Sequence, residues 1–239
     1  MSAAPSQNQI NHLIELFEAR RLEQAEALAM LLTQRFPKHP FAWKVLGAVL
    51  QQMGRLEESL APMQSASRLS PQDAEAHSNF GVALKQLGRL DEAEASYKKA
   101  IAVKPNHAGV HSNLGAMLRE VGRLDEAEAS CRQAIAIKPE FAEAHSNLGN
   151  TLKELGRLDE AEASFRQAIV LKPDLAEAHY NLGNTLKELG GSEEAEASYK
   201  KAIAIKPDYA GVHSNLGAML KEIGRLDEAE ASCRKAIAV

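Results

Sequence analysis

Covalent cross-links and bulky aromatic side chains are scarce in this sequence. Its 239 residues include two cysteines, one tryptophan, four tyrosines and six phenylalanines. Cys131 and Cys233 are three repeats of 34 residues apart, so stacked helices at ~8–10 Å per layer would hold them beyond disulfide reach, and no paired cysteines stand at the spacing of a zinc site. Two unpaired thiols suit a reducing compartment, and we expect a cytoplasmic protein.

The sequence also has no excess of positive charge and no long apolar run. Lysine and arginine number 28 against 32 aspartates and glutamates, for a net charge of −4. Such a balance offers no general attraction to nucleic acid or to an anionic membrane. No apolar segment reaches the eighteen residues of a membrane span, and the first twenty residues lack the basic and apolar regions of a signal peptide.

One unit of 34 residues, repeated along the chain, dominates the sequence. Its period is set by prolines at 37, 71, 105, 139, 173 and 207. The repeats run over 6–39, 40–73, 74–107, 108–141, 142–175, 176–209 and 210–239, so we expect one domain over residues 1–239. The first two repeats are diverged, as a capping repeat is, and the last is incomplete. We therefore expect either a fragment of a longer protein or an end that stacks on another copy.

The unit 142–175 predicts two helices of about a dozen residues. Gly156 separates them and Pro173 closes the second, since neither residue continues a helix readily. Asp159 and Glu162 predict an acidic, capping-box-like start for the second helix. No strand-like alternation occurs, so we expect an all-α, right-handed superhelical solenoid of helix–turn–helix repeats.

Small residues at fixed places predict close packing of the two helices in each unit. Gly149, Ala161 and Ala168 recur in register along the chain, while Leu148, Leu152 and Phe165 fill the remaining space. A helix pair of this kind cannot cover its own apolar surface, so neighbouring repeats must stack. Gly190, Gly191 and Ser192 replace the usual Gly-Arg-Leu of the turn, which should destabilise that turn by ~1 kcal/mol.

This pattern of Leu-Gly, Ala, aromatic, Ala and Pro over 34 residues resembles the tetratricopeptide repeat (TPR). The sequence "AHSNLGNTLKELGRLDEAEASFRQAIVLKPD" is most similar to the repeat region of O-linked N-acetylglucosamine transferases and bacterial SPINDLY-type proteins. The resemblance implies that the open face of each first helix lines a concave groove in which extended peptides bind. It also implies that asparagines in the groove hold the backbone of the bound segment.

Helical spacing separates two faces of each first helix. His111, Leu114, Gly115 and Leu118 share a stripe that we expect to be buried. Gly109, Ser112, Asn113, Ala116, Arg119 and Glu120 fall on the opposite arc, which we expect to be open to solvent. The serines and asparagines there stand where a carboxylate clamp for chaperone C-termini would need lysine and arginine, which argues against such a clamp.

Two series of polar residues on this open arc are the candidate peptide-binding residues. The first consists of Asn79, Asn113, Asn147, Asn181 and Asn215, and the second of Lys85, Arg119, Lys153, Lys187 and Lys221. A carboxamide donates and accepts hydrogen bonds, so it pairs with a peptide unit regardless of side chain. The alternatives are that the asparagines join neighbouring helices and that the cations are solvated surface charge.

The repeated histidines at 77, 111, 145, 179 and 213 invite a metal or acid–base hypothesis. Equivalent positions on stacked helices are about 8–10 Å apart, too far to share an ion bound at ~2 Å, so we expect packing histidines and no metal. No phosphate loop or catalytic triad motif occurs. We therefore expect no enzyme and no cofactor in this chain; a catalytic domain would lie outside it.

The sequence thus predicts a protein–protein interaction scaffold that binds extended protein segments, as the recruiting part of a larger protein such as a glycosyltransferase. The alternative is a scaffold that self-associates through its C-terminal end. An RNA-reading helical repeat ranks third, because the acidic balance counts against it. We expect no nucleic-acid or membrane partner.

Overall fold

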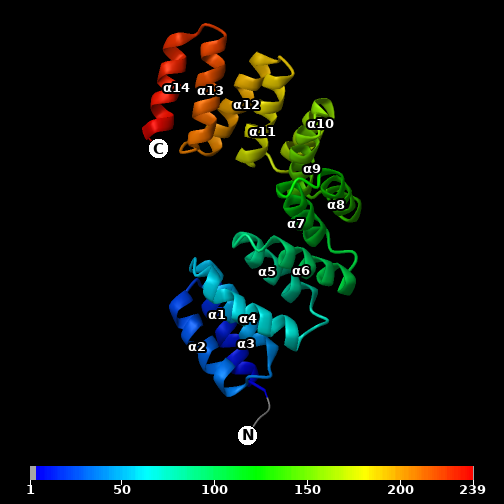
Figure 1. Ribbon diagram of the computed structural model, residues 1–239. Coiled ribbons are helices and arrows are strands. Elements are labelled where there is room, and N and C mark those ends of the chain that lie inside the picture. The colour runs from blue at the N-terminus through cyan, green and yellow to red at the C-terminus, as the bar shows by residue number, and fades with distance from the viewer. Residues whose placement is uncertain (1–3, 239) are drawn as a thin grey trace. The chain divides into compact units, whose positions relative to one another are not determined.

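The computed structural model describes residues 4–238. Within them the chain forms fourteen α-helices and no strand, as the sequence predicted (Figure 1). In chain order the helices are α1 (Gln7–Glu18), α2 (Leu22–Arg35), α3 (Pro40–Gln52), α4 (Leu56–Leu69), α5 (Ala74–Gln86), α6 (Leu90–Val103), α7 (Ala108–Glu120), α8 (Leu124–Ile137), α9 (Ala142–Glu154), α10 (Leu158–Leu171), α11 (Ala176–Glu188), α12 (Ser192–Ile205), α13 (Ala210–Glu222) and α14 (Leu226–Ala238).

The chain divides into two compact units, residues 1–113 and 114–239, and we describe each by itself. In both units the two helices of a repeat pack on each other, and the second helix packs on the first helix of the next repeat. First helices of successive repeats also touch, as α9 and α11 do. This nearest-neighbour stacking is that of a helical-repeat solenoid.

The close approach of the two helices in a repeat depends on a glycine facing a larger side chain. A Cβ added to Gly149 would lie 2.7 Å from Cε1 of Phe165, and one added to Gly183 would lie 2.7 Å from Tyr199. Phe165 and Tyr199 are fully buried, as are Ala161, Ala168 and their equivalents Ala195 and Ala202 in the next repeat. The predicted role of the small residues is confirmed.

The turn between the two helices ends on a glycine with a left-handed backbone. Gly156 has a φ of 75° and Gly190 a φ of 85°. The residue after this glycine has a negative φ and is not left-handed: Arg157 has φ −89° and ψ 66°, and Gly191 has nearly the same values, −82° and 66°. Gly191 therefore keeps the shape of the turn, and what it lacks is the arginine side chain.

The predicted capping box at Asp159 is wrong. Helix α10 begins at Leu158 with Arg157 as its N-cap and no side-chain cap, so Asp159 and Glu160 lie inside the first turn, where they still favour the helix dipole. A capping box does occur at the start of α1, where Ser6 and Gln9 bond reciprocally to each other's backbone N–H.

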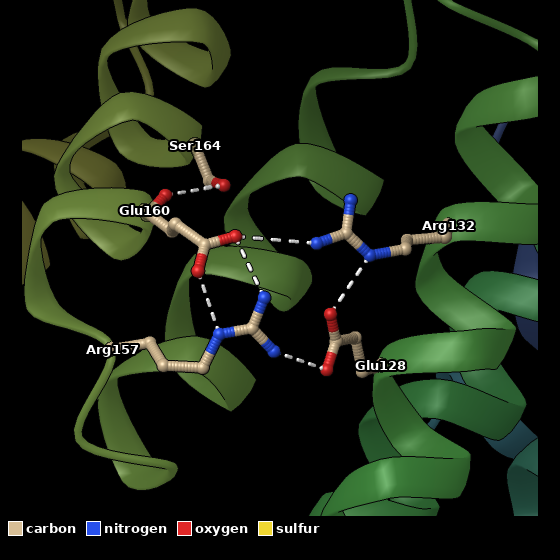
Figure 2. Close-up of polar contacts among 5 residues, drawn as sticks. All are labelled: Glu128, Arg132, Arg157, Glu160 and Ser164. Atoms are coloured by element: carbon tan, nitrogen blue, oxygen red, sulfur yellow. Dashed lines mark hydrogen bonds and ion pairs between the residues drawn. The ribbon is translucent and has the colours of Figure 1, made fainter.

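The arginine of the turn joins successive repeats electrostatically. Figure 2 shows Arg157 bonded to Glu128 of α8 at 2.7 Å and to Glu160 of its own α10 at 2.7 Å. Arg132 closes the ring of charges through Glu128 at 2.8 Å and Glu160 at 3.5 Å. Arg55 makes the same connection in the first unit, with Glu26 at 2.7 Å and Glu58 at 2.6 Å. We call this contact the arginine staple.

Candidate functional site

The repeated histidines fasten one repeat to the next. The Nε2 atoms of His77 and His111 in the first unit lie 3.1 and 2.8 Å from the carbonyl oxygens of Pro71 and Pro105. A carbonyl oxygen only accepts, so Nε2 carries the proton. The remaining rings do the same to the proline six residues earlier: His145, His179 and His213, each at 2.9 Å.

Trp43, which occupies the histidine position of the second repeat, makes the equivalent bond. Its Nε1 donates to the carbonyl of Pro37 at 2.9 Å. The common requirement at this position is therefore a flat ring with an N–H at its rim. In residues 4–238 no three histidine, cysteine, aspartate or glutamate side chains come together as a metal site would need.

The asparagine series lies on the first helices, with differing surroundings. Asn79 is exposed, and Asn113, Asn147, Asn181 and Asn215 are half-buried. Within residues 4–238, the carboxamides of Asn79, Asn113 and Asn181 form no hydrogen bond. In the second unit Asn150 and Asn184 add a second amide one turn further along α9 and α11. We call Asn147, Asn150, Asn181, Asn184 and Asn215 the amide face.

Three members of the cation series form ion pairs between consecutive first helices. In the second unit Arg119 pairs with Glu154, Lys153 with Glu188 at 2.8 Å, and Lys187 with Glu222 at 2.7 Å. In the first unit Gln51 donates to Gln86 at 2.9 Å in the corresponding position, with two amides in place of two charges. Each such cation is thus held by the glutamate of the following repeat, which the sequence had not suggested.

A tyrosine cluster interrupts the regular pattern between α11 and α13. Tyr180 stands where the other copies of the motif have serine, and its ring centroid is 5.2 Å from that of Tyr209 and 6.3 Å from that of Tyr199. Asn215 donates through Nδ2 to the Tyr180 hydroxyl and to Asn184 Oδ1, both at 2.9 Å. At Asn215, then, the amide does join neighbouring helices.

Asn184 is the hub of this cluster. Its Oδ1 also accepts from the Tyr199 hydroxyl at 2.8 Å. Burial raises the pKa of Tyr199, which keeps the phenol neutral, and Glu188 and Glu222 raise it further. Beside this hub lies a hollow of about 340 Å³, lined by Lys153, Asn184, Lys187, Glu188, Tyr199, Asn215 and Ala218.

One assignment of the open arc is wrong. Ser112 is 2% exposed and Ser146 is 6% exposed, so these serines are buried rather than open to solvent. In the second unit α9, which carries Ser146, packs on α8, α10 and α11, so more than one side of this helix is covered. Tyr180 and Asn184 were not among the predicted site residues. The signal that could have found them is the single change from "HSNLG" to "HYNLG" at 179–183.

The second unit therefore offers a row of neutral amides beside fixed ion pairs and one hollow with a polar floor. Such a surface can exchange hydrogen bonds with a polar chain. None of the helices within residues 4–238 combines the length and apolar character that crossing a membrane requires.

Models of the tetratricopeptide repeat match most of the chain. "TPR repeat" matches residues 149–190 and 183–224, and "Tetratricopeptide repeat" matches 40–106, 78–140, 130–163 and 214–239. A helical-repeat scaffold is the class of protein that this fold defines. The chain belongs to the tetratricopeptide repeat proteins, whose fold serves protein–protein interaction.

Solved structures agree with this fold. MamA is 27% identical over 66% of this chain and 92% of its own, with a TM-score of 0.59. PilF of Pseudomonas aeruginosa is 22% identical, covering 81% and 88% of the two chains, with a TM-score of 0.72. YrrB, described as a TPR protein with an unusual peptide-binding site, is 24% identical over 77% and 95%, with a TM-score of 0.58. No curated protein matches the chain.

Proposed function

We propose that this protein binds extended segments of partner proteins along the asparagine series of its first helices. The observation that supports the proposal is that Asn79, Asn113 and Asn181 have carboxamides with no hydrogen bond to residues 4–238. A polar group left in this way on a folded surface is available to a ligand, and an amide matches a peptide unit in both donor and acceptor.

The spacing of repeats suits an extended chain. Stacked helices step by about 8–10 Å, and an extended peptide rises by about 3.3 Å per residue. One asparagine would then meet about every third residue of the ligand. Because the contact is made to the backbone, the side chains of the ligand are read by other groups on the same helices.

A selection from a library of random linear peptides tests the proposal. The immobilised chain should enrich binding peptides, and the combined variant Asn79→Ala, Asn113→Ala and Asn181→Ala should lose them, with unchanged helicity and melting because these carboxamides form no hydrogen bond within residues 4–238. Gln133→Ala with Gln167→Ala, two exposed amides on second helices, is the control. Peptides that bind the asparagine variant as well as the wild type would refute the proposal.

We further propose that the binding surface recruits substrates or partners for a larger protein such as a glycosyltransferase. The support is the amino-acid sequence of unit 142–175. Sequencing of the reading frame beyond residue 239 tests this proposal. The alternative, self-association, is favoured by the apolar side chains that α14 exposes: Leu226 at 63% and Ile237 at 87%. Light scattering over a concentration series tests it, since a strict monomer at high concentration excludes it.

A further inference from the structure

The lysines next to the amide face, Lys153 and Lys187, are not available as independent charges. Lys153 and Lys187 each hold the glutamate of the following repeat, at 2.8 and 2.7 Å. Each pair has no net charge, so a carboxylate arriving at Lys187 must displace or approach Glu222, and an incoming cation meets the lysine. A row of such pairs attracts neither acidic nor basic segments over a distance.

The hollow beside Asn184 keeps unused hydrogen-bonding capacity of both kinds. Asn184 Oδ1 accepts from Tyr199 and Asn215, which directs its Nδ2 group away from those partners. Within residues 4–238, the Nδ2 of Asn184 has no acceptor and the Oδ1 of Asn215 has no donor. The floor thus presents neutral donors and a neutral acceptor next to one another.

The equivalent place one repeat earlier lacks this arrangement. Asn150 corresponds to Asn184, but Phe165 stands in place of Tyr199 and the buried Ser146 in place of Tyr180. Neither a phenol nor a second tyrosine is present there to orient the amide. The polar hollow is therefore a local feature of α11–α13 rather than a consequence of the repeat.

We propose that the hollow at Asn184, Asn215 and Tyr199 binds an uncharged hydrogen-bonding side chain, a hydroxyl or a carboxamide, of the segment held on the amide face. The proposal rests on the peptide-binding function above and assigns its side-chain specificity. Its ligand class is a neutral segment containing serine, threonine, asparagine or glutamine.

Two measurements on the peptides selected from the random library test the assignment: their amino-acid composition and the salt dependence of their dissociation constants. We expect enrichment of neutral peptides with a hydroxyl or amide residue, and a dissociation constant that changes by less than about twofold between low and high NaCl, because no net charge is neutralised. Selected peptides rich in acidic or basic residues, with binding that weakens strongly in salt, would overturn the assignment while leaving the peptide-binding function intact.

A charge placed at the hub tests its location. Asn184→Asp keeps the oxygen that accepts from Tyr199 and Asn215 but removes the two donors, so the neutral peptides should bind about tenfold more weakly. Gln167→Glu, the same amide-to-carboxylate change at an exposed position on the second helix α10, is the control and should alter binding little. Equal losses in both variants, or no loss at Asn184, would overturn the assignment; no enriched peptide at all would instead refute the peptide-binding function.

Discussion

At the scale of the residue, the contact between a glycine and a large buried side chain determines how closely the two helices of a repeat approach. At Gly183 a methyl group would lie 2.7 Å from both Cδ1 and Cε1 of the fully buried Tyr199. The ring cannot retreat without disturbing its hydrogen bond to Asn184. The glycine is therefore required by space and not by backbone conformation.

Gly183→Ala should lower the free energy of unfolding by about 1–3 kcal/mol, the usual cost of an overpacked core. Gly211→Ala is the control in the same unit: its methyl group would be 3.8 Å from the nearest atoms, and replacing a helical glycine by alanine gains up to about 1 kcal/mol. Urea unfolding of both variants measures the difference. Equal effects would show that the contact with Tyr199 is not the constraint.

The two cysteines should differ sharply in reactivity. Burial raises the pKa of Cys131 to about 12, and its side chain is fully buried, whereas Cys233 is exposed. Alkylation by iodoacetamide at neutral pH should modify Cys233 and leave Cys131 unmodified until denaturant is added. Mass spectrometry of the native protein checks this, and rapid modification of Cys131 would contradict its placement.

At the scale of the element, the arginine staple connects a turn to the preceding repeat. Gly191 has the same backbone angles as Arg157 and is preceded by the same turn, yet it has no side chain to reach Glu162 of α10. In its absence Arg166 of α10 bonds Glu162 at 2.7 Å and Glu194 at 2.6 Å. The junction between these repeats is thus held by one arginine fewer.

Gly191→Arg should stabilise the protein. An added methylene at this position meets only an ordinary contact of 3.5 Å with the Leu186 carbonyl, and the guanidinium can reach acidic partners on both helices. The melting temperature should rise above that of the control Gly191→Gln, which shares the loss of backbone freedom but not the charge. A glutamine variant as stable as the arginine variant would assign the gain to the backbone alone.

The staple also predicts a dependence on pH. Its hydrogen bonds from Arg157 lower the pKa of Glu160 in the folded state below the ordinary value of about 4.3. As the pH falls, Glu160 is therefore protonated first in the unfolded chain. The stabilisation by the staple is complete above the unfolded pKa of Glu160 and is lost as the pH falls through its folded pKa.

Arg157→Gln should melt below the wild type at neutral pH and approach it at pH values where Glu160 is protonated. Arg68→Gln, which changes an exposed arginine without an ion pair in residues 4–238, is the control and should differ little from wild type at either pH. Thermal melts at both pH values measure this. A constant difference between Arg157→Gln and wild type would exclude the ion pair as its cause.

The elements themselves followed from the sequence, because period, glycine and proline are local signals. The face of each helix followed only in part. A helical projection assigns two faces, whereas α9 packs on α10, on α8 before it and on α11, and Ser146 outside the predicted stripe is buried as well. The pairing of Lys153 with Glu188 depends on how one repeat is rotated against the next. The 34-residue period of the sequence gives no information on that rotation.

At the scale of the whole molecule, stacked repeats stabilise one another through nearest neighbours, so a helix with fewer neighbours should open first. In α14 the only buried side chain among the described residues is that of Ala229, whereas α10 buries Ala161, Phe165 and Ala168. Stability should therefore be graded along residues 114–238.

Hydrogen exchange measured by mass spectrometry should show this gradient. The amides of Leu226–Ala238 are expected to exchange before those of Leu158–Leu171 at neutral pH. Uniform exchange across both helices would mean that residues 114–238 unfold as one cooperative unit, and would contradict a nearest-neighbour description.

The hydrogen bond from a ring N–H to the proline carbonyl six residues earlier joins two repeats. Both of its partners lie in one short stretch of sequence across the repeat boundary. The segments 92–137 and 194–239 are near-copies, and both keep this bond, at 2.8 Å from His111 to Pro105 and at 2.9 Å from His213 to Pro207. A block of whole repeats that is copied and inserted thus brings its own attachment and needs no compensating change at the seam. Duplication of a block of repeats within the gene would therefore lengthen the chain and supply this bond at the new junction.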